Sequence, residues 1–366
     1  MILRRGLLAL VMLGGAGVAA ADVASDQAAA IVVYPVVFTS AAAGVDTLVQ
    51  LSNTSNTAVS ARCFYVNANG HCSNDGSVCF SGAECGGGLC LPGWSETDFR
   101  VTLTPRQPLA WLASEGLSTF CTPAQTPGER CLPLDGRSRG GAGQSNAGSR
   151  VPPVGEPTFV GELRCVAVDD QDRPSERNVL VGATTMVQAL AGSYDLVRHN
   201  AIGIPAIAGA NDGDDMLRLG EEYAACPHTL ILDHFFDDAV DPATGAAALG
   251  VVALVPCSVD FELQDPSAVI AQFLVFNEFE QRFSSSTLVD CFALRRLSNL
   301  DTTQPVRSIF NVGVAGSLIG QTRIRGVGAG GHGLLGAFFD AHGNQSAAAN
   351  IHFQGISDPG DVIRLP

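Results

Sequence analysis

The chain is dominated by short stretches in which apolar and polar residues alternate with a period of two. In DFRVTLTP (98–105), Phe99, Val101 and Leu103 fall on one side of an extended backbone, and polar residues fall on the other. This alternation is typical of strands that bury one face. It predicts an antiparallel sheet with one buried and one solvated face.

The stretch ELRCVAV (162–168) repeats the pattern. Leu163 and Cys165 share the face expected to be buried, and Glu162 and Arg164 lie on the face expected to contact water. Runs rich in Val, Thr and Phe are cut at short intervals by Gly, Pro, Asn and Asp, and no convincing helical pattern with caps follows the N-terminus. The predicted fold class is all-β, built from antiparallel β-sandwich (Ig-like) domains.

The last ten residues, SDPGDVIRLP (357–366), echo an internal segment, NDGDDMLRLG (211–220). The aligned pairs are Asp212 with Asp358, Asp215 with Asp361, Arg218 with Arg364 and Leu219 with Leu365. Such an echo is expected if the chain holds two copies of one β domain.

Three further matches occur in the same order along the two halves. DTLVQLSNTSNTAVSARCFYVN matches AVIAQFLVFNEFEQRFSSSTLVDCFAL, which aligns Asn53 with Asn277 at strand ends and Cys63 with Cys291. DFRVTLTP and PLAWLAS match IFNVGVAG and IGQTRIRGV, and GELRCVAVDDQDRPSERNVLVG matches GLLGAFFDAHGNQSAAANIHFQG. The interpretation is tandem duplication, with domains at 22–222 and 223–366. The alternative is convergent composition, because strands resemble one another.

The N-terminus, residues 1–21, is predicted to be a secretory signal peptide. Arg4 and Arg5 precede a short apolar run, and Ala19 and Ala21 give a small-x-small pattern before a cleavage site. The run is too short for a transmembrane anchor. Its removal changes the formal net charge from −15 to −17, and so acidic a chain disfavours nucleic acid as a partner. Every basic residue is arginine, which excludes lysine chemistry such as Schiff-base formation.

All 11 cysteines follow the predicted signal peptide, so export predicts that most are paired and that one is left over. Cys63 is expected to pair with Cys165, because both lie on inward faces of strands. Cys226 is expected to pair with Cys257 at the open end of a predicted hairpin. Cys291 is the expected free thiol, because Gly336 stands where the first copy has Cys165.

Four cysteines fall in the insertion CSNDGSVCFSGAECGGGLC (72–90), which lacks the apolar residues for a core of its own. Cys72, Cys79, Cys85 and Cys90 are therefore expected to pair among themselves, in an order that the sequence leaves open. A zinc site is the alternative, but the Cys-x2-Cys spacing is missing. The insertion resembles the short Cys-rich modules of exported bacterial proteins and of Dickkopf-like domains, and the resemblance implies no chemistry.

A loop at 121–153 is rich in Gly, Ser and Arg and is predicted to be flexible, with Cys121 and Cys131 closing its start. Its GQSNAG stretch faintly resembles a nucleophile elbow around Ser145, but the strand and helix that this motif needs are missing.

Two acidic clusters are the densest groups of possible metal ligands. The calcium candidates are Asp169, Asp170, Asp172, Asp212 and Asp214. Neither cluster has the spacing of a calcium loop, and solvated turns are the preferred interpretation. His228 and His234 are too far apart along a strand to share a metal and are expected at a surface or an interface. The sequence predicts no cofactor and no catalytic set.

The stretches FNEFEQRFSSST, GQTRIRGVG and RLP resemble uncharacterised exported bacterial tandem β-sandwich proteins, a resemblance that implies no activity. The leading hypothesis is a non-catalytic exported structural or binding protein of the periplasm, cell surface or exterior. Its partner would be a protein or a glycan of the cell envelope. The alternative is a secreted hydrolase with a site between the two domains; a deep polar cleft would favour it, and a flat exposed face would favour binding.

Overall fold

The computed structural model describes residues 22–79, 82–91, 93–117, 150–328 and 331–366. These residues form 24 strands, three 3₁₀ turns at Gly82–Cys85, Leu297–Asn299 and Pro305–Arg307, and one short helix, α1 (Val312–Ala315). Within this part of the chain, no helix has the length and apolar character needed to cross a membrane. The fold is therefore all-β, as the alternation predicts. The predicted signal peptide and the pair Cys121 and Cys131 lie outside the described residues, as does Ser145.

The first half of the chain forms a sandwich, here called the N-terminal sandwich, whose two layers are joined at the β1–β2 turn. One layer runs β12/β1-β9-β3-β7 and the other runs β11-β10-β2-β8. The bounds are β1 (Ile31–Ser40), β2 (Val45–Asn53), β3 (Val59–Asn67), β7 (Ser95–Leu103), β8 (Pro108–Leu112), β9 (Thr158–Val168), β10 (Leu180–Leu190), β11 (Ser193–Asn200) and β12 (Ile202–Ile204). Val49 and Leu51 of one layer and Tyr65 and Leu163 of the other meet in a fully buried core.

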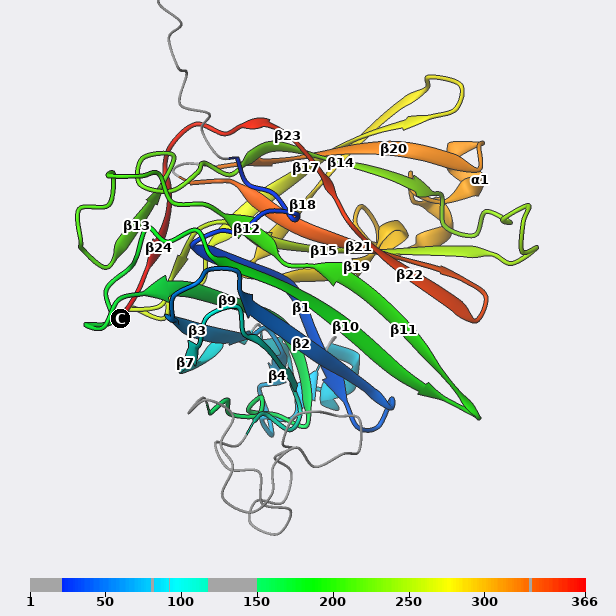
Figure 1. Cartoon of the computed structure of the whole chain (residues 1–366). Coiled ribbons are helices and arrows are strands. Elements are labelled where there is room, and N and C mark those ends of the chain that lie inside the picture. The colour runs from blue at the N-terminus through cyan, green and yellow to red at the C-terminus, as the bar shows by residue number, and fades with distance from the viewer. Residues whose placement is uncertain (1–21, 80–81, 92, 118–149, 329–330) are drawn as a thin grey trace, which may run out of the picture.

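The second half forms the C-terminal sandwich, in which a five-stranded sheet, β18-β17-β20-β14-β23, packs on a four-stranded sheet, β19-β15-β21-β22. The bounds are β14 (Pro227–Phe235), β15 (Ala248–Pro256), β17 (Ala268–Asn277), β18 (Arg282–Asp290), β19 (Ala293–Arg296), β20 (Ile319–Val327), β21 (Leu334–His342), β22 (Gln345–Asn350) and β23 (His352–Ile356). Phe273 and Phe310 meet edge to face in its core. Figure 1 shows this sandwich, from the green β14 through yellow to red, lying against the N-terminal one, in blue to green.

The two echoed segments lie side by side. β13 (Met216–Leu219) pairs antiparallel with β24 (Asp361–Arg364), and β16 (Val259–Asp260) completes a small sheet. Leu217 faces Ile363, which is its own equivalent in the sequence alignment. The echoed strands are therefore related by a local two-fold rotation. This pairing agrees with duplication, which stays a prediction.

Other parts of the alignment do not share one geometry. β17 and β18 pair as a hairpin, whereas their sequence equivalents β2 and β3 lie in different layers. The segment IFNVGVAG (309–316), expected as a strand, forms α1 instead, with Asn311 capping its first turn and Gly316 ending it at φ 68°.

Strand β9 buries both faces, which corrects the expectation that one of them is wet. Glu162 and Arg164 are each 1% exposed, like the apolar residues opposite them. The C-terminal sandwich covers this face: Arg164 donates hydrogen bonds to the carbonyl oxygens of Pro256 and Cys257, at 2.6 and 2.7 Å. The polar residues of β9 therefore join the two sandwiches instead of facing solvent.

Four disulfides occur among the described residues. Cys63 and Cys165, paired from the sequence, stand directly opposite each other on adjacent strands β3 and β9. Cys226 and Cys257 are bonded as expected, but the hairpin argument for them is wrong: β14 pairs with β20 and β23, and β15 with β19 and β21, so this disulfide links two sheets. Cys291 is free and buried.

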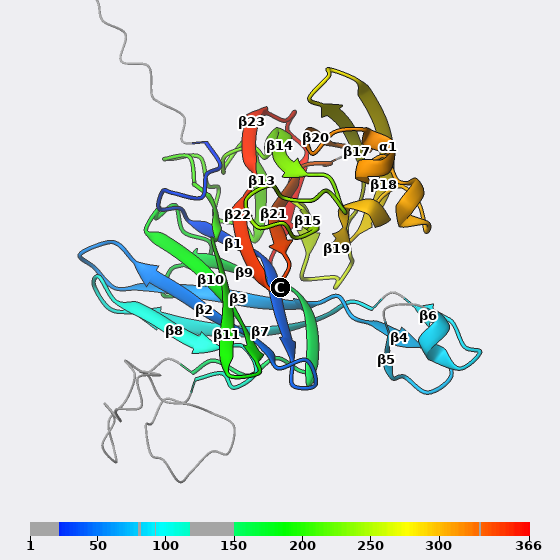
Figure 2. The same ribbon diagram turned by 90° about the vertical axis from the view of Figure 1, so that its right-hand side faces the viewer.

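The Cys-rich insertion is a small unit of its own. It contains β4 (Gly70–Cys72), β5 (Val78–Cys79) and β6 (Cys90–Leu91), and bonds join Cys72 to Cys85 and Cys79 to Cys90. Figure 2 shows it projecting from the end of the N-terminal sandwich.

Candidate functional site

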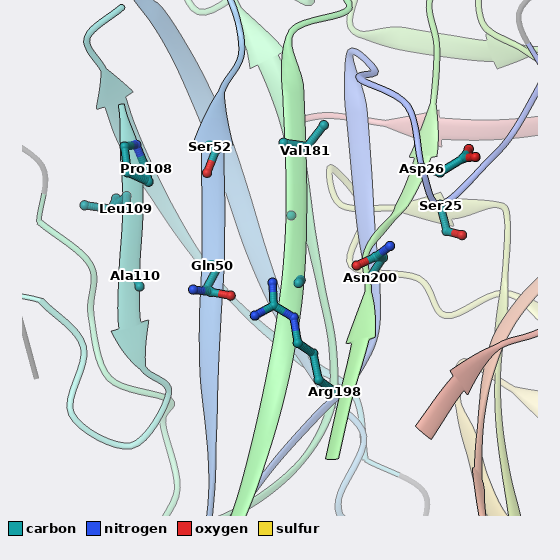
Figure 3. A pocket seen from close by; sticks show the side chains of 12 residues that line it. Ser25, Asp26, Gln50, Ser52, Pro108, Leu109, Ala110, Val181, Arg198 and Asn200 are labelled. Atoms are coloured by element: carbon teal, nitrogen blue, oxygen red, sulfur yellow. The ribbon is translucent and has the colours of Figure 1, made fainter. Parts of the chain in front are cut away.

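A groove crosses the solvent side of the β8-β2-β10-β11 layer (Figure 3) and is here called the N-terminal groove. Its volume is about 570 Å³. It is lined by Ser25, Asp26, Gln50, Ser52, Pro108, Leu109, Ala110, Val181, Gly182, Ala183, Arg198 and Asn200.

The strand register explains why this face is hollow. Gln50 pairs with Ala110 on one side and with Ala183 on the other, and Ala183 pairs in turn with Asn200. Small side chains therefore flank Gln50 and form a floor. Gly182 is required beneath them, because a Cβ atom there would lie 2.1 Å from the Tyr34 hydroxyl oxygen.

Arg198 is the basic group of the N-terminal groove, and Asp26 is its acidic group. Its exposed side chain makes no hydrogen bond or ion pair within the described residues, and Figure 3 shows it reaching across β10 toward Gln50. The Gln50 side-chain oxygen is likewise unpartnered. An unpaired guanidinium beside a free amide suits a ligand that carries a carboxylate or phosphate. Sequence reasoning missed Arg198, because the neighbours of Arg198 are set by the pairing of β10 with β11 and with β2.

Along the same face of β11, Tyr194 lies four residues before Arg198, so that the alternation of the strand places both on the solvent side. Tyr194 is 72% exposed. A large exposed aromatic ring beside an open polar groove offers a flat apolar surface to a ligand.

A second groove, the C-terminal groove, crosses the solvent side of the five-stranded sheet and has a volume of about 660 Å³. Gln272 of β17 pairs with Ser286 of β18 on one side and with Arg325 of β20 on the other. Arg325 is exposed and makes no hydrogen bond or ion pair within the described residues, and Arg323 lies over the Phe276 ring at 5.9 Å. The two grooves thus combine the same groups: an amide, hydroxyls and unpaired guanidinium.

A third hollow, the inter-sandwich cleft, has a volume of about 230 Å³ and an apolar lining. Its walls come from β1, β2, β10 and β11 on one side and from β15, β19, β21 and β22 on the other. The apolar residues are Val36, Phe38, Val45, Met186, Val197, Leu249, Val251, Leu294, Phe339 and Ala341.

The buried histidines are structural. His234, expected at a surface or interface, is 5% exposed, and its Nε2 lies 2.8 Å from the Thr322 hydroxyl. His199 makes the same contact with Thr184 at 2.8 Å. Burial lowers the pKa of His199 to about 4 and also lowers the pKa of His234. Both rings are therefore neutral at pH 7.

His342 has the opposite environment. Its two ring nitrogens each lie 2.9 Å from a carboxylate oxygen, one of Asp241 and one of Asp340. These hydrogen bonds raise the pKa of His342. Because each ring nitrogen contacts a carboxylate, neither nitrogen is free to take a proton from a nucleophile. His342, Asp241 and Asp340 therefore form a structural cluster of ion pairs. His342 thus offers the hydrolase alternative no free general base.

The acidic clusters are neutralised by arginine. Asp169 accepts from the backbone and side chain of Arg173, so its pKa is lowered mainly by the Arg173 N–H group. Asp212, Asp214 and Glu222 converge within 4.8 Å, but the Arg218 guanidinium lies 3.2 Å from Asp212 and 3.0 Å from Asp214. A cation would have to displace that guanidinium. Of the remaining calcium candidates, Asp170 is exposed and Asp172 pairs with Arg100 at 2.8 Å.

The Cys-rich insertion places three of its sulfur atoms close together, at Cys72, Cys79 and Cys85. All four cysteines of the insertion are consumed by its two disulfides, so none offers zinc a thiolate. Comparison of the chain with protein-family models, with curated proteins and with solved structures finds no match.

Proposed function

We propose that the protein is a non-catalytic exported binding protein whose ligand is an acidic glycan of the cell envelope or exterior. The observation that carries this proposal is the unpaired Arg198 in an open groove of an acidic chain. Other arginines of this acidic chain pair with carboxylates, as Arg173 and Arg218 do. A guanidinium without one, beside free amide and hydroxyl groups, is suited to the carboxylates and hydroxyls of a sugar acid.

The shape of the grooves also supports a glycan. Each crosses the face of a sheet, where backbone groups are already paired, so a peptide could not add there as an extra strand. Tyr194 and Arg198 stand on one side of the same strand, about 13 Å apart along it. The aromatic ring can therefore stack on one sugar of a chain while the guanidinium holds the carboxylate of another.

Isothermal titration calorimetry with oligogalacturonate, a glycan of sugar acids, and with neutral dextran oligosaccharides tests the proposal. We expect oligogalacturonate to bind and dextran to bind much more weakly. Losing one charge-assisted contact costs about 1.5–3 kcal/mol, so Arg198→Ala should lower affinity by roughly tenfold to a hundredfold.

The control is Arg307→Ala, because Arg307 is exposed and lies outside both grooves. It should leave the affinity unchanged. Equal binding of dextran, or an Arg198→Ala variant that binds oligogalacturonate like the parent protein, would contradict the proposal.

A further inference from the structure

The inter-sandwich cleft is a separate candidate for ligand binding. It lies on the opposite side of the β10–β11 hairpin from the N-terminal groove, because Met186 and Val197 pair across the hairpin and both face the C-terminal sandwich. Figure 1 shows this hairpin extending beyond the rest of its own sandwich. At the end of the hairpin, the apolar face that carries Met186 and Val197 is therefore covered only by the sheet of the C-terminal sandwich.

That cover is incomplete. Phe38, Met186, Val197, Val251 and Leu294 pack together but remain only partly buried. They surround a volume of about 230 Å³, whereas an apolar cavity of about 150 Å³ is enough to bind benzene in another protein. The cleft thus has room for a ring with a short side chain. Met186 adds a flexible side chain that can adapt to such a ligand.

One end of the cleft is acidic. Asp195 on β11 pairs directly with Gln188 on β10, and both line the cleft. Within the described residues, neither side chain has a hydrogen-bond or ion-pair partner, and no basic side chain lines the cleft. Asp340 also borders the cleft; its Oδ2 lies 2.9 Å from His342 Nε2, and its Oδ1 has no hydrogen-bond partner among the described residues. Because His342 lies against Asp340, Asp195 is the carboxylate of the cleft that has no basic side chain beside it.

We propose that the inter-sandwich cleft binds a small molecule with an apolar body and a protonated amine, an arylalkylamine or short alkylamine. The body would pack between Met186, Val197 and Val251. The ammonium would pair with Asp195, and Gln188 would accept a second hydrogen bond from it. Charge complementarity selects a cation, because an anion would meet an unpaired carboxylate and no positive side chain.

Three probes of similar size and different charge test this inference: phenethylamine, 2-phenylethanol and 3-phenylpropionate. In calorimetric titrations at pH 7, we expect phenethylamine to bind at least about tenfold more tightly than the alcohol. Phenylpropionate should bind more weakly still. Asp195→Asn should remove the preference for the amine while leaving the affinity for the alcohol unchanged.

A pair of variants on one strand locates the site. Val197→Trp should abolish binding by filling the cleft, whereas Leu196→Trp should not, because Leu196 points to the other side of β11 and is 59% exposed. Arg198→Ala should leave amine binding unchanged, which separates this test from that of the glycan groove. The inference fails if no probe binds, if all three bind equally, or if Asp195→Asn keeps the preference for the amine.

Discussion

The two sandwiches solve some structural problems alike and others differently. Each ends a strand at a buried asparagine whose side chain bonds the following turn: the Asn53 side-chain oxygen accepts from the Ser55 N–H, and that of Asn277 accepts from the Phe279 N–H. Such turns were expected from the sequence, because asparagine can replace backbone partners in a tight loop. Local chemistry is therefore shared even where the strand order differs.

The disulfides show the difference. Cys63–Cys165 connects neighbouring strands of one layer that are already hydrogen-bonded to each other. Cys226–Cys257 connects two sheets of the C-terminal sandwich that share no backbone ladder. The first therefore acts mainly by restricting the unfolded chain, and the second also restrains how the two sheets pack. Among the described residues, no disulfide joins the two sandwiches. Buried polar contacts join them instead.

The largest expected effect comes from breaking that junction. Arg164 bonds Glu162 and two carbonyl groups of the C-terminal sandwich, all in a dry environment. Arg164→Met leaves Glu162 as an uncompensated buried carboxylate and should cost roughly 3–5 kcal/mol of unfolding free energy. Urea denaturation at pH 7 measures it.

The double variant Glu162→Leu/Arg164→Met is the matched control. It removes the uncompensated charge and should recover part of the loss, because a buried ion pair can often be replaced by apolar residues. A single variant that costs less than about 1 kcal/mol would show that water reaches this junction.

The next effect compares the two disulfides. In the chain-entropy model, Cys63–Cys165, at a sequence separation of 102, contributes roughly 4–5 kcal/mol, and Cys226–Cys257, at a separation of 31, contributes roughly 3.5. We expect Cys63→Ala/Cys165→Ala to destabilise more than Cys226→Ala/Cys257→Ala in urea denaturation. The reverse order would mean that restraint of the two sheets outweighs loop length.

Sequence patterning predicted the strands well where one face meets solvent. In β7, Val101 and Leu103 are buried and Arg100 is exposed, as expected. It failed at β9, because alternation cannot reveal that a second domain covers the polar face of a strand. The Cys226–Cys257 bond was predicted correctly but from a hairpin that does not exist. Cysteines that flank two strands can also meet when the strands lie in different, stacked sheets.

The candidate sites were beyond sequence reasoning for a related reason. Arg198 and Asn200 lie between the matched segments that end at Gly182 and begin at Asn211, and Gln50 reaches them only through the pairing of β2 with β10. Their convergence depends on register between strands far apart in the chain. No local motif encodes such a register.

The next prediction is that His199 and His342 make the unfolding free energy depend on pH in opposite senses, because their environments differ. His199 has a pKa of about 4 when folded and an ordinary value of 6.5 when unfolded, so the unfolded chain binds more protons between these values. Its contribution to stability is therefore fully present above pH 6.5 and is lost as the pH falls toward 4, by roughly 3 kcal/mol. His342, with a raised pKa, acts in the opposite sense: its contribution is present below pH 6.5 and is lost as the pH rises through its folded value.

Unfolding free energies of the parent and of His199→Gln, measured from pH 7 to pH 4, isolate this effect. The variant should lose less stability than the parent over that range, because its amide does not titrate. His342→Gln should instead show a steeper loss on acidification. Parallel curves for the parent and both variants would contradict the assigned environments.

The smallest effect concerns the cysteine that the C-terminal sandwich leaves unpaired. Cys291 aligns with Cys63, but counting from Gly161 and Gly333 places Cys165 opposite Ala337, one residue beyond Gly336, and neither Gly336 nor Ala337 is a cysteine. Burial, together with the nearby Glu162 carboxylate, raises the pKa of the Cys291 thiol, so the reactive thiolate is scarce at neutral pH.

Iodoacetamide should therefore leave the native protein unlabelled. After denaturation without reductant, peptide mapping should find one label among the cysteines of the described residues, at Cys291. Cys291→Ala should cost only about 1 kcal/mol, since the thiol acts as a small apolar group. A label on Cys63 or Cys165 would break both their pairing and the alignment that leaves Cys291 alone. Rapid labelling of native Cys291 would contradict its burial. It would mean that the C-terminal sandwich opens near β19 far more readily than the N-terminal sandwich opens around the Cys63–Cys165 disulfide.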